Sequence, residues 1–335
     1  MIRVGVMRGG MSDEYEVSLR TGAQVLEAIS RLPQDKYKAL DMLVTRNGDW
    51  HLNGLPVTLE KLKESVDIVW NALHGGSGED GTLASFLYRN GIPYTGSHAF
   101  PSALAMEKNL AKKKVKMHGI KVPQDYIVNP YDTASGISIS DYATEQAGYV
   151  FRSTPPPWIV KPVSGGSSLG IVLARTLPEL GRAISKALSY GDALIVEEFI
   201  EGKEATAGVV EGLRGEELYA LVPIEILKDK KEMYDYFQKY SLSGRTVVGG
   251  SFTAREKEML QVLARSVHQL LGLRHYSRSD FVINPRGEVY FIEVNSLPGL
   301  TEHSLVPQAL SAVGVSMSQF VEHVLDQAVS EYSVV

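Results

Sequence analysis

The fold of this chain is decided by the stretch Ser279-Asp-Phe-Val-Ile-Asn-Pro-Arg-Gly-Glu-Val-Tyr-Phe-Ile-Glu-Val-Asn295. Two apolar runs flank the short link Pro285-Arg-Gly287, which is typical of a β-hairpin. Because side chains alternate between the faces of a strand, Glu293 and Asn295 share one face, and the hairpin brings Asp280 close to them. Two carboxylates and an amide are oxygen ligands of the kind that Mg²⁺ prefers. We therefore predict a magnesium site here rather than a set of solvated acids.

The composition is that of a globular protein with more than one domain. A chain of 335 residues with 44% hydrophobic residues suits two or three packed units. The net charge is −5 and there is no basic tail, so nucleic acid is not expected as a partner. Cysteine is absent, which excludes disulfides, thiolate metal sites and a cysteine nucleophile. No apolar run approaches the ~20 residues of a membrane span, and the chain enters a strand at once, so we expect a cytoplasmic protein without membrane contact.

The N-terminal third has the alternating pattern of a parallel α/β unit. An apolar strand at residues 2–7 is followed by a glycine loop and an amphipathic helix at residues 16–29. A second apolar strand, at residues 66–73, runs into the glycine-rich loop that begins at His74. Strand, glycine loop and helix, repeated, predict a parallel sheet whose ligand side lies at the strand C-termini. We place the end of this unit at residue 122.

The rest of the chain has a mixed pattern. Residues 123–221 are assigned to a strand-rich central unit with a second glycine loop. Residues 222–335 are assigned to a third unit with a long helix, the hairpin and two C-terminal helices. The predicted class is therefore α/β (α+β) with three units. The lysine-rich stretch 108–116 has helical spacing, and we interpret it as one solvated helix face.

The loop between Lys161 and Gly170 is suited to phosphate. Its glycines allow backbone N–H groups to approach an anion closely, and Ser167 and Ser168 add hydroxyl donors. Strands flank the loop and the Gly-Lys-Ser/Thr ending is missing, so it is not a P-loop. A flexible surface hairpin is the alternative. The lysine inside the preceding strand favours phosphate, because a buried lysine needs an anionic partner.

Three acidic residues and one arginine lie at or near the ends of other predicted strands. Glu197 and Glu198 end one predicted strand and Glu204 begins the next, so they contact either a nucleotide or, as isolated acids, solvent. Arg278 shares the strand face of Asp280. It either stabilises charge that develops at a metal-bound phosphate or forms a salt bridge with the hairpin glutamate.

Several further positions can be interpreted either as functional or as merely structural. His74 ends a strand in a glycine loop, which raises its functional odds, although a lone histidine is more often structural. Glu16 either favours the first turn of its helix or binds a substrate ammonium. The amides after Pro298-Gly299, together with the Ser304 hydroxyl, suit a small carboxylate. The polar, aromatic stretch 234–244 is either a lid over the site or a plain connecting loop.

These segments together resemble one family. Over essentially its whole length the chain is similar to the D-alanine–D-alanine ligases of the ATP-grasp superfamily. The matching segments, in the family's order, are residues 9–19, 72–82, 92–97, 103–108, 161–170, 234–240, 278–295 and 298–307. So many segments in the right order are highly specific, whereas no single one would be.

The resemblance implies a three-domain ATP-grasp fold and an ATP-dependent ligase that joins two D-alanines for peptidoglycan synthesis. It also implies a homodimer and two Mg²⁺ ions, which Mn²⁺ can replace, held by Asp280, Glu293 and Asn295. The residues implied to bind ATP are Lys108, Lys161, Ser168, Glu197, Glu198, Phe199, Ile200, Glu204 and Lys239. Those implied in catalysis are Glu16, His74, Ser167, Tyr240, Arg278 and Gly299. Those implied to bind substrate are Glu16, His74, Ser304 and Leu305.

The implied mechanism has two steps. The carboxylate of the first D-alanine attacks the γ-phosphate of ATP, and the amine of the second D-alanine attacks the resulting acylphosphate. Arg278 and the Gly299 amide would stabilise the tetrahedral oxyanion. Glu16, Ser167 and Tyr240 would form a hydrogen-bonded triad that ties the lid to the site.

The sequence departs from the family pattern in three places. Ser164-Gly165 replaces an arginine–glutamate pair, residues 295–299 read Asn-Ser-Leu-Pro-Gly instead of Asn-Thr-Ser-Pro-Gly, and residues 241–250 lack the usual acidic residue. Two other hypotheses therefore stay open: a ligase for another D-amino or D-hydroxy acid pair, and a non-catalytic nucleotide-binding homologue. Tyr240 favours D-alanine as the second substrate, and the intact metal and lysine positions argue against a non-catalytic protein.

Overall fold

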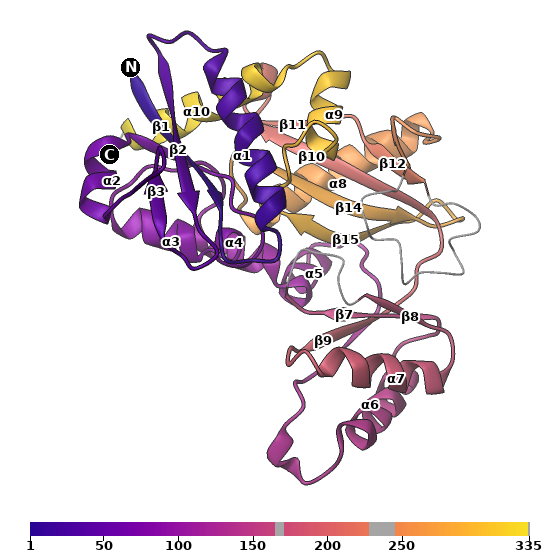
Figure 1. Cartoon of the computed structure of the whole chain (residues 1–335). Helices are drawn as coiled ribbons and strands as arrows, with labels where there is room; N and C mark the ends of the chain where they lie inside the picture. The colour runs from indigo at the N-terminus through magenta and orange to yellow at the C-terminus, as the bar shows by residue number, and fades with distance from the viewer. Residues whose placement is uncertain (165–170, 228–244, 334–335) are drawn as a thin grey trace.

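The computed structural model describes residues 1–164, 171–227 and 245–333. Its first sheet has the strand order β4-β3-β2-β1-β5, and β1 runs parallel to both β2 and β5 (Figure 1). This confirms the predicted parallel N-terminal sheet. The strands are β1 (Ile2–Gly9), β2 (Tyr37–Val44), β3 (Trp50–Leu52), β4 (Leu55–Pro56) and β5 (Ile68–Asn71). The helices are α1 (Tyr15–Ser30), α2 (Leu59–Ser65), α3 (Thr82–Arg89), α4 (Ala99–Met106) and α5 (Lys108–Lys116).

The second sheet belongs to a separate lobe that carries α6 and α7 on one face (Figure 1). Its antiparallel strand order is β6-β9-β7-β8. The elements are β6 (Asp125–Val128), α6 (Ile139–Ser153), β7 (Trp158–Pro162), β8 (Val172–Ala174), α7 (Leu177–Leu188) and β9 (Leu194–Glu198). Helix α6 begins where the Ser138 side chain accepts a hydrogen bond from the Asp141 amide at 3.1 Å, a standard N-cap.

The third sheet has the order β13-β12-β10-β14-β15, with β11 beside β10. Its elements are β10 (Lys203–Glu211), β11 (Leu218–Ala220), β12 (Ile224–Leu227), β13 (Arg245–Val248), α8 (Ala254–Leu271), β14 (Tyr276–Ile283), β15 (Val289–Asn295), α9 (Leu305–Ala312) and α10 (Met317–Ser333). Strand β10, which we had placed in the central unit by sequence, pairs with β14. Its small residues Ala205 and Ala207 are buried in the same core as α8 residues such as Leu260, which explains why the strand sits in this sheet.

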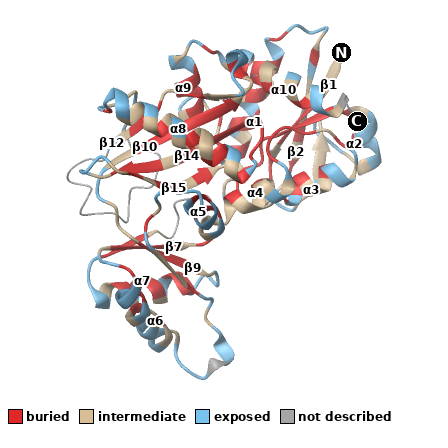
Figure 2. Ribbon diagram, turned by 180° about the vertical axis from the view of Figure 1, so that it is seen from behind, coloured by how far each residue is buried: buried red, intermediate tan, exposed pale blue. Residues whose placement is uncertain are grey.

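The first and third sheets share one hydrophobic core. Trp70 of β5 stacks on Tyr276 of β14 with ring centroids 6.3 Å apart, and Phe320 of α10 meets Tyr276 edge-on at 5.2 Å. All four residues of β5 are buried, and Figure 2 shows β14 as largely buried and helices such as α2 as exposed on their outer faces. Because this core holds the two sheets together, the loops at their adjoining ends keep fixed positions relative to one another, as a binding site requires. In the described part of the chain, no helix has the length and apolar character needed to cross a membrane.

Candidate active site

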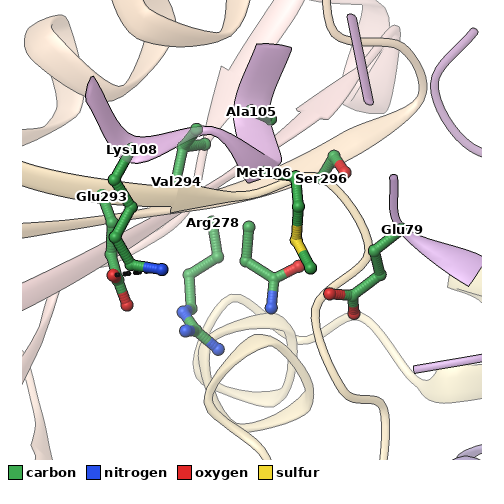
Figure 3. Close-up of a pocket in the computed structure, with 9 residues that line it drawn as sticks. Glu79, Ala105, Met106, Lys108, Arg278, Glu293, Val294 and Ser296 are labelled. Carbon is green, nitrogen blue, oxygen red and sulfur yellow. Dashed lines mark ion pairs between the residues drawn. The ribbon is translucent and has the colours of Figure 1, made fainter. Parts of the chain in front are cut away.

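A pocket opens between the connection of α4 to α5 and the strands β14 and β15. Glu79 approaches it from one side, Lys108 and Glu293 from the other, and Arg278 lies between them (Figure 3). Asn295 also lines it, together with Ala105, Met106, Val294 and Ser296. The pocket therefore collects two basic and two acidic side chains from three separate segments of the chain.

The predicted hairpin forms part of this wall. Asp280 lies opposite Glu293, and Arg278 lies opposite Asn295. The turn is set locally: Gly287 adopts a positive φ of 77°, and the Asn284 side chain accepts hydrogen bonds from two backbone amides of the turn at 3.0 and 2.9 Å. The turn sets the pairing of residues 281–283 with residues 289–291, and a register shift between Asp280 and Phe281 then places Glu293, rather than Ile292, opposite Asp280. The two acids therefore come together as the sequence predicted, but the turn alone does not explain it.

Arg278 binds Asp280, and not Glu293 as the salt-bridge alternative supposed. Its Nε and Nη2 atoms donate to the two carboxylate oxygens of Asp280, each at 3.1 Å. Burial disfavours the charged guanidinium, but Asp280, together with Glu293 and Glu79, outweighs this effect and raises the pKa of Arg278. The hydroxyl of Thr206 on β10 also donates to Asp280, at 2.5 Å. Nothing in the local sequence around Thr206 marked it as part of the site.

Glu293 faces a cluster of positive charge. Its carboxylate lies 3.9 Å from the ammonium of Lys108, the first residue of α5 (Figure 3). Burial opposes ionisation of Glu293, yet Lys108, Lys161 and Arg278 together hold the pKa of this carboxyl below its usual value. Glu293 is therefore an anion surrounded by cations in this structure.

A second charge cluster lies deeper, at the junction of the central sheet and α5. Lys161 of β7 is buried and its ammonium lies 3.0 Å from Glu197 of β9. The other carboxylate oxygen of Glu197 accepts a hydrogen bond from Lys112. Lys112 is 1% exposed, so the interpretation of residues 108–116 as a solvated face is wrong at this position. Glu197 draws one side of the helix inward, while Lys113, Lys114 and Lys116 remain exposed.

The buried lysines have perturbed acidities. Burial lowers the pKa of Lys161 to about 8. Burial, and then repulsion from Lys161, lowers the pKa of Lys112 as well. Glu197 is 3% exposed and so is not the solvated edge acid that the sequence left open.

The other residues predicted to bind ATP border the passage from the second sheet to the third. The Glu198 carboxylate accepts a hydrogen bond from the Gln124 amide at 2.8 Å. Phe199 is anchored through its own amide to the Pro157 carbonyl at 2.8 Å, and Ile200 follows it. Glu204 is the second residue of β10 and lies opposite Val282 of β14. These side chains lie on either side of the hinge between two sheets, which is a common location for a ligand.

His74 is buried behind the pocket rather than facing it. One ring nitrogen lies 3.3 Å from Glu79 and the other lies 2.8 Å from the Thr21 hydroxyl. The Leu300 amide donates to the same hydroxyl at 3.4 Å. Of these hydrogen-bonded residues, Glu79 is the one that lines the pocket, and reasoning from the sequence did not single it out. His74 therefore links helix α1, the glycine loop and the turn before α9.

The turn after Pro298 holds Gly299 and Ser304 close together. Thr301 donates its amide to the Ser304 hydroxyl at 3.1 Å, and a Cβ added to Gly299 would lie 3.2 Å from that hydroxyl. Ser304 is the N-cap position of α9, and Leu305 is its first helical residue. The helix thus starts directly behind the turn, where its first amides can receive a carboxylate.

Glu16 has a different environment from the buried residues. It is 65% exposed and its carboxylate lies 3.3 Å from the Arg46 guanidinium. Ser167 and Ser168 of the glycine loop, and Lys239 and Tyr240 of the expected lid, lie outside the described residues. The proposed triad of Glu16, Ser167 and Tyr240 therefore stays a prediction.

The hairpin residues fit a hard cation by their chemistry. Asp280, Glu293 and Asn295 offer only oxygen atoms from two paired strands. Within residues 1–164, 171–227 and 245–333, no three His, Cys, Asp or Glu side chains gather as a metal site, so the Asn295 amide would be the third protein ligand. A cation would also have to take Asp280 from Arg278. The donor set fits Mg²⁺ under that condition.

Comparison with known proteins gives first the class and then the family. The structure of the VanG D-Ala:D-Ser ligase from Enterococcus faecalis superposes with a TM-score of 0.82 at 30% identity, over 98% of this chain and 99% of that chain. The D-alanine–D-alanine ligase from Bacillus anthracis, complexed with ATP, superposes with a TM-score of 0.78 at 26% identity, over 99% of each chain. The fold is thus the ATP-grasp fold, and with this site it defines an ATP-grasp ligase.

The sequence matches narrow this class. The family model described as D-ala D-ala ligase C-terminus matches residues 128–326, and the one for the N-terminus matches residues 53–97. The D-alanine–D-alanine ligase B of Clostridium perfringens is 32% identical over 331 residues, which covers 98% of this chain and 99% of the relative. The chain belongs to the D-alanine–D-alanine ligase family.

Proposed function

We propose that the protein uses ATP to join two D-alanine molecules into D-alanyl-D-alanine, a precursor of peptidoglycan. The observation that carries this function is the pocket in which Lys108 and Arg278 face Glu293 and Glu79, in a chain that belongs to the family over its full length. Cations next to acids suit a reaction in which phosphate and carboxylate charges develop and move.

In the first step the carboxylate of one D-alanine attacks the γ-phosphate of ATP. Lys108 and Lys161 supply fixed positive charge at the phosphates, and Ser168 and Lys239 add donors. Asp280, Glu293 and Asn295 would hold two Mg²⁺ ions, replaceable by Mn²⁺, which neutralise phosphate charge when bound. The distance of 3.9 Å between Lys108 and Glu293 supports a shared position for the phosphate and its counter-charges.

The adenosine part of ATP would lie at the passage between the second and third sheets. Glu197 and Glu198 at the end of β9 and Glu204 at the start of β10 flank this passage. Phe199 and Ile200 provide an apolar surface and backbone groups for the adenine. The proposal draws support from the position of these residues between two sheets that are joined by one short segment.

In the second step the amine of the other D-alanine attacks the acylphosphate. Arg278 and the Gly299 amide would stabilise the oxyanion, and Ser304 with the first amide of α9, that of Leu305, would hold the carboxylate of the second substrate. Glu16 would bind the ammonium of the first D-alanine, and His74 would orient Glu79 beside it. Closure of residues around Tyr240 and Ser167 would exclude water from the acylphosphate.

The proposed assembly and location are those expected for the family. We propose a homodimer that works in the cytoplasm, where the nucleotide is available, with three domains of which the central one ends before β10. Sedimentation equilibrium tests the dimer: the mass of a single chain at micromolar concentration would contradict the proposed homodimer.

The activity is tested by phosphate release from ATP with D-alanine, D-serine and D-lactate as second substrates. D-alanine alone should support turnover, and Glu293→Gln should abolish it while the melting temperature stays close to that of the unchanged protein. The similarity to a D-Ala:D-Ser ligase makes D-serine the second candidate. Faster turnover with D-serine than with D-alanine would replace the first proposal, and ATP binding without any phosphate release would replace both.

A further inference from the structure

Lys112 has an unusual position for a lysine. It lies on α5, is 1% exposed, and hydrogen-bonds to one carboxylate oxygen of Glu197. A buried ammonium is stable only when it is paired, so this contact is built into the fold rather than incidental. No substrate contact is needed to explain it, and none of the roles assigned above uses Lys112.

The charge balance around Glu197 gives Lys112 a role. Lys161, which is also buried, lies 3.0 Å from the other oxygen of the same carboxylate. Two lysine side chains thus share one carboxylate, so the trio of Lys112, Lys161 and Glu197 has one positive charge in excess when both lysines are protonated. Asp125, Glu293 and Lys108 are the further charged groups that act on these lysines. Without Lys112, the pair of Lys161 and Glu197 would be neutral.

We propose that Lys112 is a positioning residue that serves as the permanent counter-ion of Glu197, so that Lys161 keeps its charge available for a phosphate of the nucleotide. This inference rests on the proposed function only in its assignment of Lys161 to ATP. When ATP binds, Lys161 can turn toward phosphate while Lys112 keeps the carboxylate neutralised. A neutral pair would instead make Glu197 compete with the nucleotide for the same ammonium.

The place of α5 supports this division of work. Lys108 at the start of the helix faces the pocket, and its amide donates to the Val163 carbonyl, directly after β7, at 3.2 Å. Lys112 lies one helical turn further and hydrogen-bonds to Glu197 of β9, the strand next to β7. One helix therefore brings one lysine to the pocket and another to the carboxylate beneath it.

The test compares charged and neutral replacements of Lys112 in the full-length protein. Lys112→Met should raise the dissociation constant for ATP, measured by calorimetry, and the KM for ATP by at least about tenfold, with the KM for D-alanine changed by less than about twofold. Lys112→Gln, which keeps a hydrogen-bond donor toward Glu197 but has no charge, should weaken ATP binding about as much as Lys112→Met. Lys112→Arg should retain most of the affinity, and Lys113→Met, which removes an exposed lysine of the same helix, should change nothing.

The outcomes separate a charge role from a merely structural one. Unchanged ATP affinity in Lys112→Gln would overturn the proposal, and so would unchanged ATP affinity in Lys112→Met. If Lys112→Met does not fold, Lys112→Gln and Lys112→Arg decide between them: equal ATP affinity in these two variants also overturns the proposal. Calorimetry needs no turnover, so a protein that binds ATP but does not join D-alanine would contradict the proposed function and leave this inference standing.

Discussion

Thr206→Val tests whether Asp280 holds a metal. Thr206 is 2% exposed and its hydroxyl donates to the Asp280 carboxylate at 2.5 Å. Valine has nearly the same shape but no donor, so the substitution removes one hydrogen bond to a charged group, worth about 1.5–3 kcal/mol. A loss of that size corresponds to roughly a 10- to 150-fold change in an equilibrium constant.

The loss should appear mainly in metal binding. In the ligand-free protein Arg278 still holds both oxygens of Asp280, each at 3.1 Å, so the folded state should lose no more than about 1.5 kcal/mol. A cation that takes Asp280 from Arg278 leaves Thr206 as the donor that orients the carboxylate. The concentration of Mg²⁺ at half-maximal activity should therefore rise about 10- to 100-fold.

The assay is phosphate release as a function of Mg²⁺ at saturating ATP and D-alanine, together with Mn²⁺ binding followed by electron paramagnetic resonance. Thr206→Ser, which keeps the hydroxyl, is the matched control and should behave as the unchanged protein. If Thr206→Val lowers the melting temperature but leaves both metal curves within about twofold, Asp280 is not a metal ligand and the reasoning fails.

Three further predictions concern charge and shape at the pocket. Arg278→Met should lower kcat about 100- to 1,000-fold while the KM for ATP changes little, because the guanidinium is assigned to the transition state; a drop below tenfold would contradict that role. Burial lowers the pKa of Lys161 to about 8, so its charged form is lost as the pH rises through that value. The kcat/KM for ATP should therefore fall about tenfold per pH unit above it. Lys161→Arg should flatten this profile between pH 8 and 10, and an unchanged slope in that variant would show that another group ionises. Gly299→Ala places a Cβ 3.2 Å from the Ser304 hydroxyl. It should raise the KM for the second D-alanine a few-fold and leave the KM for ATP unchanged. A rise in the KM for ATP alone would show that this turn does not bind the second D-alanine.

The hairpin could be predicted from the sequence because its turn residues and its strand alternation lie within one short stretch. The register shift between Asp280 and Phe281, which brings Glu293 opposite Asp280, could not be predicted from that alternation. The parallel first sheet was likewise predictable, since strand, glycine loop and helix repeat along the chain. Both features follow from patterns that can be read within a single hairpin or a single strand–loop–helix unit.

Residues whose environment comes from distant segments could not be assigned in this way. Lys112 sits among other lysines, and its burial depends on Glu197, 85 residues further along the chain. Thr206 joins the site only because β10 pairs with β14, and that pairing crosses the boundary we had drawn between units. Periodicity reports that a residue lies on one face of a helix or strand, but not what that face meets.

The charges in the ligand-free site have a consequence for how ligands enter. Arg278 pairs with Asp280, Lys108 with Glu293, and Lys161 with Glu197, so each basic group has an acidic partner before any substrate arrives. A free anion would have to break these pairs and leave buried carboxylates without a partner, which is unfavourable. A nucleotide accompanied by a divalent cation brings both signs at once: phosphate for the basic groups and metal for Asp280 and Glu293. We infer that ATP without a metal should bind far more weakly than ATP with one, and that Lys112 reduces this dependence at Glu197, to which it hydrogen-bonds as a second basic group.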